Sequence, residues 1–193
     1  ARLQDLLKEN ASIDAPKAAS FLRIRKGVGE AELGLANEMA INQFIAHHSV
    51  IFQPEKKRMW VSTAPWQCGK YVAYDLNRIF SDSIDFNHEI YTENLTVPAD
   101  SFLQQQEYQQ LMTYKRLAPV LRKQIKKKER LDEQTLHAFQ HANPHFFYVY
   151  ELLGDYYHAT GQQDKALRNW KKALLLPIPK RSESERIEHK INN

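Results

Sequence analysis

The stretch IAHHSVIFQPEKKRMWVSTAPWQCGKY, from Ile45 to Tyr71, decides the fold of the first half of this chain. Residues 45–52 are apolar on both alternating faces, a pattern typical of a strand that is covered above and below. Pro65 and Gly69 then interrupt the extended pattern before it resumes. The expected elements are strands at 45–52, 59–62 and 71–74, with a polar turn at 54–57. The stretch therefore predicts a β-hairpin with a third extended piece.

Helical patterns flank this hairpin on both sides, so the sequence predicts an α+β fold. Before it, leucines at helical spacing predict a helix that Asn10 stops, and Ser12 or Asp14 can cap a second helix. After it, a helix is expected from about Ser101, and Pro119 is expected to kink or split that helix. Further helices are expected from 131–133 to 143–144 and over 182–191, and a long surface connection is expected over 75–100.

A repeat-like pattern follows near the C-terminus. The segment YELLGDYYHATGQQDKALRNWKKALLLPIP, from Tyr150 to Pro179, resembles a tetratricopeptide repeat, an antiparallel helix pair with small residues where the helices touch. Gly154 is expected at the closest approach of the two helices, and Trp170 is expected to fill the groove between this pair and the helix before it. A single repeat cannot bury its own apolar face, so this pair, over 145–178, is expected to dock on the preceding helices.

The composition is that of an ordinary globular protein. The 193 residues include 42% hydrophobic and 26% charged side chains, and the net charge is +4. A dedicated nucleic-acid binder usually has a stronger basic surplus. The basic run 115–130 could contact phosphates, but a solvated helix face is the favoured interpretation, because no aromatic platform is interleaved there. No apolar run approaches the roughly 20 residues of a membrane helix, so no transmembrane segment is expected.

Three groups of side chains could carry chemistry, and each also has a structural interpretation. Cys68 could be a nucleophile, but a small buried residue after a strand is the favoured interpretation. His47 and His48 could bind a metal, but neighbours on a strand point to opposite faces, so no metal site is expected. Ser49, a histidine and Asp75 have the composition of a catalytic triad, without the pattern of a nucleophile elbow.

Three segments occur in a recognisable order: RLQDLLKEN, then IDAPKAASFLR, then NQFIAHHSVIFQPEKKRMWVSTAPWQCGKYVAYDL. In this order, residues 2–80 resemble the C-terminal part of penicillin acyltransferase-like proteins. These are self-cleaving N-terminal-nucleophile (Ntn) hydrolases, similar also to bile-salt hydrolases and acid ceramidases. The resemblance implies that residues 1–97 are the C-terminal portion of an αββα sandwich. Residues 98–193, which begin near VPADSF, would be a helical extension of the kind that bacterial members have.

The resemblance also implies a function. Such enzymes cut or form an amide (N-acyl) bond, linear or cyclic, without a cofactor, and their nucleophile is a cysteine that self-cleavage frees at a new N-terminus. No residue here matches that cysteine, so it is expected upstream of Ala1, in the N-terminal part of the same protein. The residues expected to line the pocket for a small amide or acyl substrate are His48, Ser49, Ser62 and Trp66.

The alternative function is a non-enzymatic, helical-repeat module that binds a protein partner through the tail. The two functions differ in what must precede Ala1, because only the enzyme needs a cysteine at a cleavage point there. The resemblance is compatible with a periplasmic location, whereas the residues alone leave the compartment and the oligomeric state open.

Overall fold

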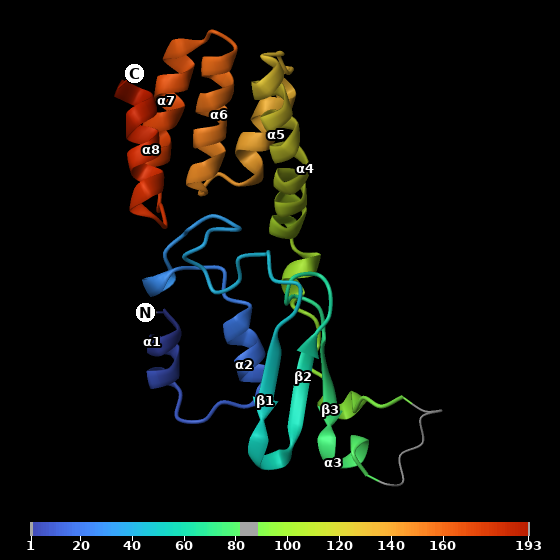
Figure 1. Cartoon of the computed structure of the whole chain (residues 1–193). Helices are drawn as coiled ribbons and strands as arrows, with labels where there is room; N and C mark the ends of the chain where they lie inside the picture. The colour runs from blue at the N-terminus through green and yellow to red at the C-terminus, as the bar shows by residue number, and fades with distance from the viewer. Residues whose placement is uncertain (1, 82–88, 193) are drawn as a thin grey trace. The chain divides into compact units, whose positions relative to one another are not determined.

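The computed structural model of the chain describes residues 2–81 and 89–192, and it has an α+β fold divided into two compact units (Figure 1). The sheet unit comprises Ala1–Gly29 and Ala40–Gln104, and the helical unit comprises Glu30–Met39 and Gln105–Asn193. The sheet unit ends at residue 104 and the main part of the helical unit begins at residue 105, whereas the sequence suggested a boundary between residues 97 and 98. The segment 30–39, from the first part of the chain, belongs with the helices.

As far as the structure describes it, the sheet unit is built on a three-stranded antiparallel sheet in the order β1-β2-β3. The strands are β1 (Val50–Gln53), β2 (Arg58–Ser62) and β3 (Tyr71–Asp75). A short 3-10 turn at Pro54–Lys56 joins β1 to β2, and Lys57 closes it in a left-handed conformation. The expected hairpin with a third strand is therefore confirmed.

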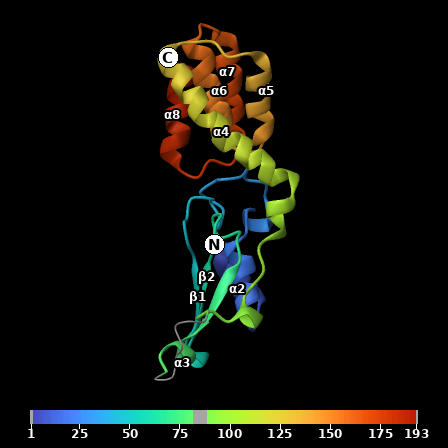
Figure 2. The same cartoon turned by 90° about the vertical axis from the view of Figure 1, so that its right-hand side faces the viewer.

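The two faces of this sheet differ. On one face, Trp60 and Ala73 are buried together with Ala19 of the helix α2 (Ala15–Leu22), which both Figures 1 and 2 show alongside the sheet. The strand register places a different set of side chains on the opposite face, and all of them are apolar or aromatic: Val50, Val61, Val72, Phe52, Met59 and Tyr74. None of these side chains is fully buried in the described residues, and Phe52 is 65% exposed.

The expectation of a strand over 45–52 covered above and below is wrong for this chain. The strand begins only at Val50, and Ile45 is 66% exposed. Alternating apolar residues show which side chains share a face, but they do not show whether anything covers that face. Here α2 covers one face and leaves the other open. We call the six side chains above the open face.

Short helices complete the sheet unit. They are α1 (Arg2–Glu9) and α3 (Leu76–Ile79), besides α2. Asn10 donates a hydrogen bond to the carbonyl of Leu6 at the end of α1, and the Asp14 carboxylate accepts from the Lys17 amide at the start of α2. Both expected helix ends are therefore confirmed. Residues 82–88 of the expected connection over 75–100 lie outside the described residues.

In its described residues, 30–39 and 105–192, the helical unit contains five α-helices, and Figure 1 shows them in the green-to-red part of the ribbon. They are α4 (Gln106–Lys127), α5 (Glu133–Ala142), α6 (Phe147–Ala159), α7 (Gln163–Leu174) and α8 (Arg181–Asn192). Asp132 caps α5 by accepting a hydrogen bond from the Thr135 amide, as its place before the helix predicts.

Pro119 does not split α4. The helix runs from Gln106 to Lys127 with the proline inside it. A proline removes one helical hydrogen bond and costs about 3 kcal/mol in a helix interior. On both sides of it, Leu117, Ala118 and Leu121 are buried, so tertiary packing stabilises the helix against this cost.

The repeat-like pair is formed by α6 and α7, which pack tightly against each other. A Cβ atom on Gly154 would lie 2.3 Å from a ring carbon of Trp170, so the indole lies directly on the glycine. Trp170 is only 2% exposed, and its indole N–H donates to the Asp155 carboxylate at 2.9 Å. The predicted close approach at Gly154 is confirmed. These contacts of Trp170, like its ring contact with His158, are with α6 of its own pair, and its predicted packing on the helix before the pair stays a prediction.

The segment 30–39 is bound to the helical unit by side-chain amides. The Leu35 amide donates to the Asn143 side chain at 2.9 Å, and that side chain donates back to the Leu35 carbonyl at 2.7 Å. The buried Asn37 amide donates to the Pro177 carbonyl at 3.0 Å. Gly34 has φ +77, and a Cβ there would lie 2.5 Å from the Phe146 nitrogen, so only glycine allows this approach.

Across the described part of the chain, no helix has the length and apolar character that crossing a membrane requires.

Candidate functional site

Three of the four predicted pocket residues lie together at one end of β1 and β2. The Ser49 amide donates to the Ser62 hydroxyl at 2.8 Å, and the Ser62 amide donates to the Ser49 carbonyl at 2.9 Å. His48 Nδ1 lies 3.4 Å from the Ser62 carbonyl oxygen. The Ser49 hydroxyl forms a short hydrogen bond with the Tyr71 hydroxyl. The two serines and the tyrosine are therefore linked through their hydroxyls and the strand backbone.

This cluster is mostly internal. Ser62 and Tyr71 are buried on the helix-covered side of the sheet, while His48 is exposed. Burial raises the pKa of the Tyr71 phenol, and the hydrogen bond with Ser49 and the nearby Arg23 guanidinium only partly oppose that rise. Tyr71 therefore stays a neutral phenol at physiological pH.

Trp66, the fourth predicted residue, belongs to a different group of contacts, around the loop 64–69. Its ring lies edge-on to Phe44 at 6.1 Å, and its carbonyl accepts a hydrogen bond from the Asn42 side chain. Arg23 donates to the carbonyls of Gln67 and Gly69, at 3.1 and 2.7 Å. Sequence reasoning missed Arg23 and Asn42 because their partners lie far along the chain.

The surroundings of Cys68 are those of a buried, structural thiol. The side chain is 0% exposed and accepts a hydrogen bond from Asn42 at 3.4 Å. Burial raises the pKa of the thiol, and the Asp100 carboxylate raises it further. A nucleophilic cysteine needs the opposite environment, with an accessible sulfur and a lowered pKa.

The triad and metal interpretations receive no geometric support. The Ser49 hydroxyl bonds to Tyr71, and the Asp75 carboxylate accepts the Asn77 amide at the start of α3. Within residues 2–81 and 89–192, no group of three or more histidine, cysteine, aspartate or glutamate side chains is arranged to hold a metal ion.

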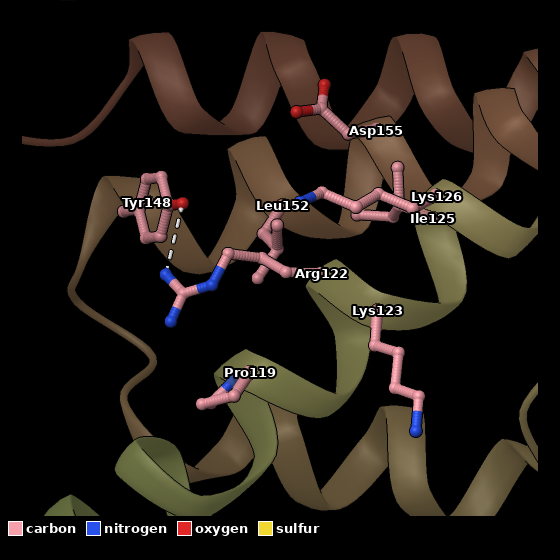
Figure 3. A pocket seen from close by; sticks show the side chains of 8 residues that line it. All are labelled: Pro119, Arg122, Lys123, Ile125, Lys126, Tyr148, Leu152 and Asp155. Atoms are coloured by element: carbon pink, nitrogen blue, oxygen red, sulfur yellow. Dashed lines mark hydrogen bonds between the residues drawn. The ribbon is translucent and has the colours of Figure 1, made fainter.

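A second candidate site is a hollow of about 490 Å³ on the helical unit, between α4 and α6. The residues that line it are Pro119, Arg122, Lys123, Ile125, Lys126, Tyr148, Leu152 and Asp155. Figure 3 shows Arg122 and Lys126 extending toward α6, with Arg122 beside the Tyr148 hydroxyl. The sequence indicated the basic run but gave no sign of the apolar wall that α6 supplies.

The carboxylates next to this hollow are already paired with cations from α8. Glu151 is 2% exposed and accepts two hydrogen bonds from Arg186, at 2.8 and 2.9 Å, and one from Lys190 at 2.7 Å. Lys190 also donates to both oxygens of Asp155 at 2.8 Å. In contrast, the ion pairs of the described residues do not include Arg122, Lys123 or Lys126.

Comparison of the chain with protein-family models, with curated proteins and with solved structures found no match.

Proposed function

We propose that this chain is the C-terminal part of an Ntn amidohydrolase or acyltransferase that cuts or forms an amide (N-acyl) bond. The open face of the sheet carries the proposal. In an αββα sandwich, each sheet has helices on one face and a second sheet on the other, and the two sheets pack through apolar side chains. Here α2 covers one face, and the opposite face is wholly apolar or aromatic.

The chemistry in this proposal comes from the family resemblance of residues 2–80. The nucleophile is a cysteine in the N-terminal part of the same protein, freed by self-cleavage, and its own amine is the general base. The environment of Cys68 supports this assignment, because a buried thiol with a raised pKa is a poor nucleophile. The sheet unit supplies strands and their supporting helix, and the second sheet comes from the N-terminal part.

The decisive experiment uses the complete protein that the proposal requires. Mass spectrometry of the purified protein should show two chains, with a cysteine at the start of the second. An N-acyl amide substrate should be hydrolysed, and replacing that cysteine with alanine should abolish both cleavage and hydrolysis. An uncleaved protein without amide hydrolysis would exclude the enzyme function.

Replacing Cys68 with alanine is expected to leave amide hydrolysis by the complete protein within a few-fold of the parent. The reason is that the thiol is buried away from substrate, whereas removal of a true nucleophile costs several orders of magnitude. The measurement is kcat/KM for an N-acyl amide. A loss of several orders of magnitude, with an unchanged circular dichroism spectrum, would place the nucleophile at Cys68.

The open face gives a second prediction, through Val61→Thr. In residues 1–193 alone, the new hydroxyl can reach water, so the free energy of unfolding should change by less than about 0.5 kcal/mol. In the complete protein, a second sheet would bury this hydroxyl without a partner, and the cost should rise to about 1–3 kcal/mol. Denaturant unfolding of both forms measures the difference.

Ala73→Thr is the matched control for this prediction, because Ala73 is buried on the covered face within this chain. It should destabilise both forms by about 1–3 kcal/mol through overpacking. An equally small effect of Val61→Thr in both forms would show that no layer covers the open face.

A further inference from the structure

We infer that the hollow between α4 and α6 binds an acidic, extended peptide segment of a partner protein. This function is separate from amide chemistry and does not depend on it. The inference rests on cations of α4 that form no ion pair in the described residues and that face the apolar and aromatic wall of α6.

The positive charge of the hollow is available to a ligand. Arg122 and Lys126 lie four residues apart on α4, so their side chains leave the same face of the helix one turn apart. Both line the hollow, both are exposed, and neither takes part in an ion pair of the described residues. Two carboxylates spaced along an extended chain would meet them without breaking an ion pair, and the hydrogen-bond partner of Arg122 among the described residues is the Tyr148 hydroxyl, at 3.5 Å.

The rest of the lining is suited to a peptide side chain. Leu152 and Ile125 are aliphatic, Pro119 presents its ring, and Tyr148 offers both a ring face and a hydroxyl. The volume of the hollow, about 490 Å³, lies within the usual range of ligand pockets, roughly 300–1,000 Å³. An apolar side chain between two acidic ones would therefore occupy the wall while the acids reach α4.

The surroundings favour a peptide over a nucleic acid. Tyr148 is the only aromatic residue of the lining, so the hollow lacks the successive stacking surfaces on which bases bind. The cations of α8 are already paired with the carboxylates of Glu151 and Asp155, so they are not available to a phosphate chain.

The test is fluorescence anisotropy with residues 1–193 and a fluorescein-labelled peptide of alternating glutamate and leucine. The variant Arg122→Glu with Lys126→Glu should weaken binding at least about tenfold at physiological salt. The matched control, Arg116→Glu with Lys127→Glu, makes the same charge change on exposed residues of α4 outside the lining. Because these two side chains do not line the hollow, the control changes the net charge without removing a direct contact, and salt weakens its remaining effect, so binding should stay within about threefold.

Each other outcome would overturn the inference. An equal loss in both variants would mean attraction to net charge alone. Equal binding of a peptide with glutamine in place of glutamate would remove the acidic requirement. Tighter binding of a short oligothymidylate, lost with the same variant, would assign the hollow to nucleic acid. No binding of the acidic peptide up to about 1 mM would mean that the hollow has no such ligand.

Discussion

Replacing Trp170 with alanine is expected to unfold or loosen the helical unit while the sheet unit stays folded. The indole is 2% exposed, lies on Gly154 and donates a hydrogen bond to Asp155. Truncating a buried tryptophan costs about 3–5 kcal/mol, through lost transfer free energy and the cavity left behind. Asp155 would also lose the indole donor, but it keeps its bonds from Lys190.

Thermal unfolding followed by circular dichroism measures this effect. A loss of 3 kcal/mol should lower the melting temperature of a unit of this size by more than about 10 °C. Hydrogen exchange should quicken in α6 and α7 and stay unchanged in β1–β3. Leu175→Ala is the matched control, since Leu175 is 84% exposed at the end of α7 and its truncation should cost less than about 0.5 kcal/mol. A melting temperature within about a degree of the parent for Trp170→Ala would refute the buried-indole packing.

Replacing Glu151 with alanine is expected to destabilise the helical unit by about 3 kcal/mol at neutral pH. Removing one partner of a buried ion pair costs about 3–5 kcal/mol, because the other charge stays without compensation. The lower end applies here because the Arg186 side chain is 47% exposed and can be hydrated. Denaturant unfolding at pH 7 gives the difference. Glu185→Ala is the control, because its pair with Arg181 lies at the surface and contributes little.

The same carboxylate makes the stability of the parent depend on pH. Burial tends to raise the pKa of Glu151, but hydrogen bonds and charge from Arg186 and Lys190 outweigh it, so the pKa lies below its usual value of 4.5. Between the lowered pKa of the native state and the usual value of 4.5, the native state therefore binds fewer protons than the unfolded chain. The stabilisation is complete above pH 4.5 and is lost as the pH falls through the lowered pKa. Glu151→Ala should lack this acid-dependent loss. An identical slope of stability against pH between 6 and 3 in parent and variant would contradict the assignment.

Local signals in the sequence predicted most of the helices and the hairpin correctly. Asp14 and Asp132 begin their helices because a cap bonds to an amide three residues away, so the pattern and its cause lie in one short window. The small Gly154 at the approach of α6 and α7 was predicted from spacing that resembles a repeat, which is also a local pattern. The predicted interruption of the helix at Pro119 did not include a split, because buried side chains on both sides of the proline stabilise a continuous α4.

Contacts between distant segments were beyond sequence reasoning. The Asn143 side chain is hydrogen-bonded to Leu35, 108 positions away in the sequence, and no local sequence pattern at either residue predicts this contact. The hollow needs α6 to supply Tyr148 and Leu152 opposite the basic run of α4, and this pairing of helices is a tertiary event. Of the predicted pocket residues, Ser49 and Ser62 are hydrogen-bonded to each other at the strand ends, because β1 and β2 are hairpin partners. Trp66 instead lies in the loop 64–69, where its carbonyl accepts a hydrogen bond from Asn42.

The segment 30–39 affects how the coding sequence of the helical unit could be transferred between genes. Asn143 and Phe146 receive this segment, so the unit is completed by residues encoded far upstream of its helices. A gene fusion that carried only the codons for 105–193 to another protein would leave the Asn143 side chain without its two hydrogen bonds to Leu35. Recombination could therefore transplant this unit only as two pieces of coding sequence that move together. We therefore expect a helical unit of this kind to be exchanged less readily between proteins than one that is continuous in sequence.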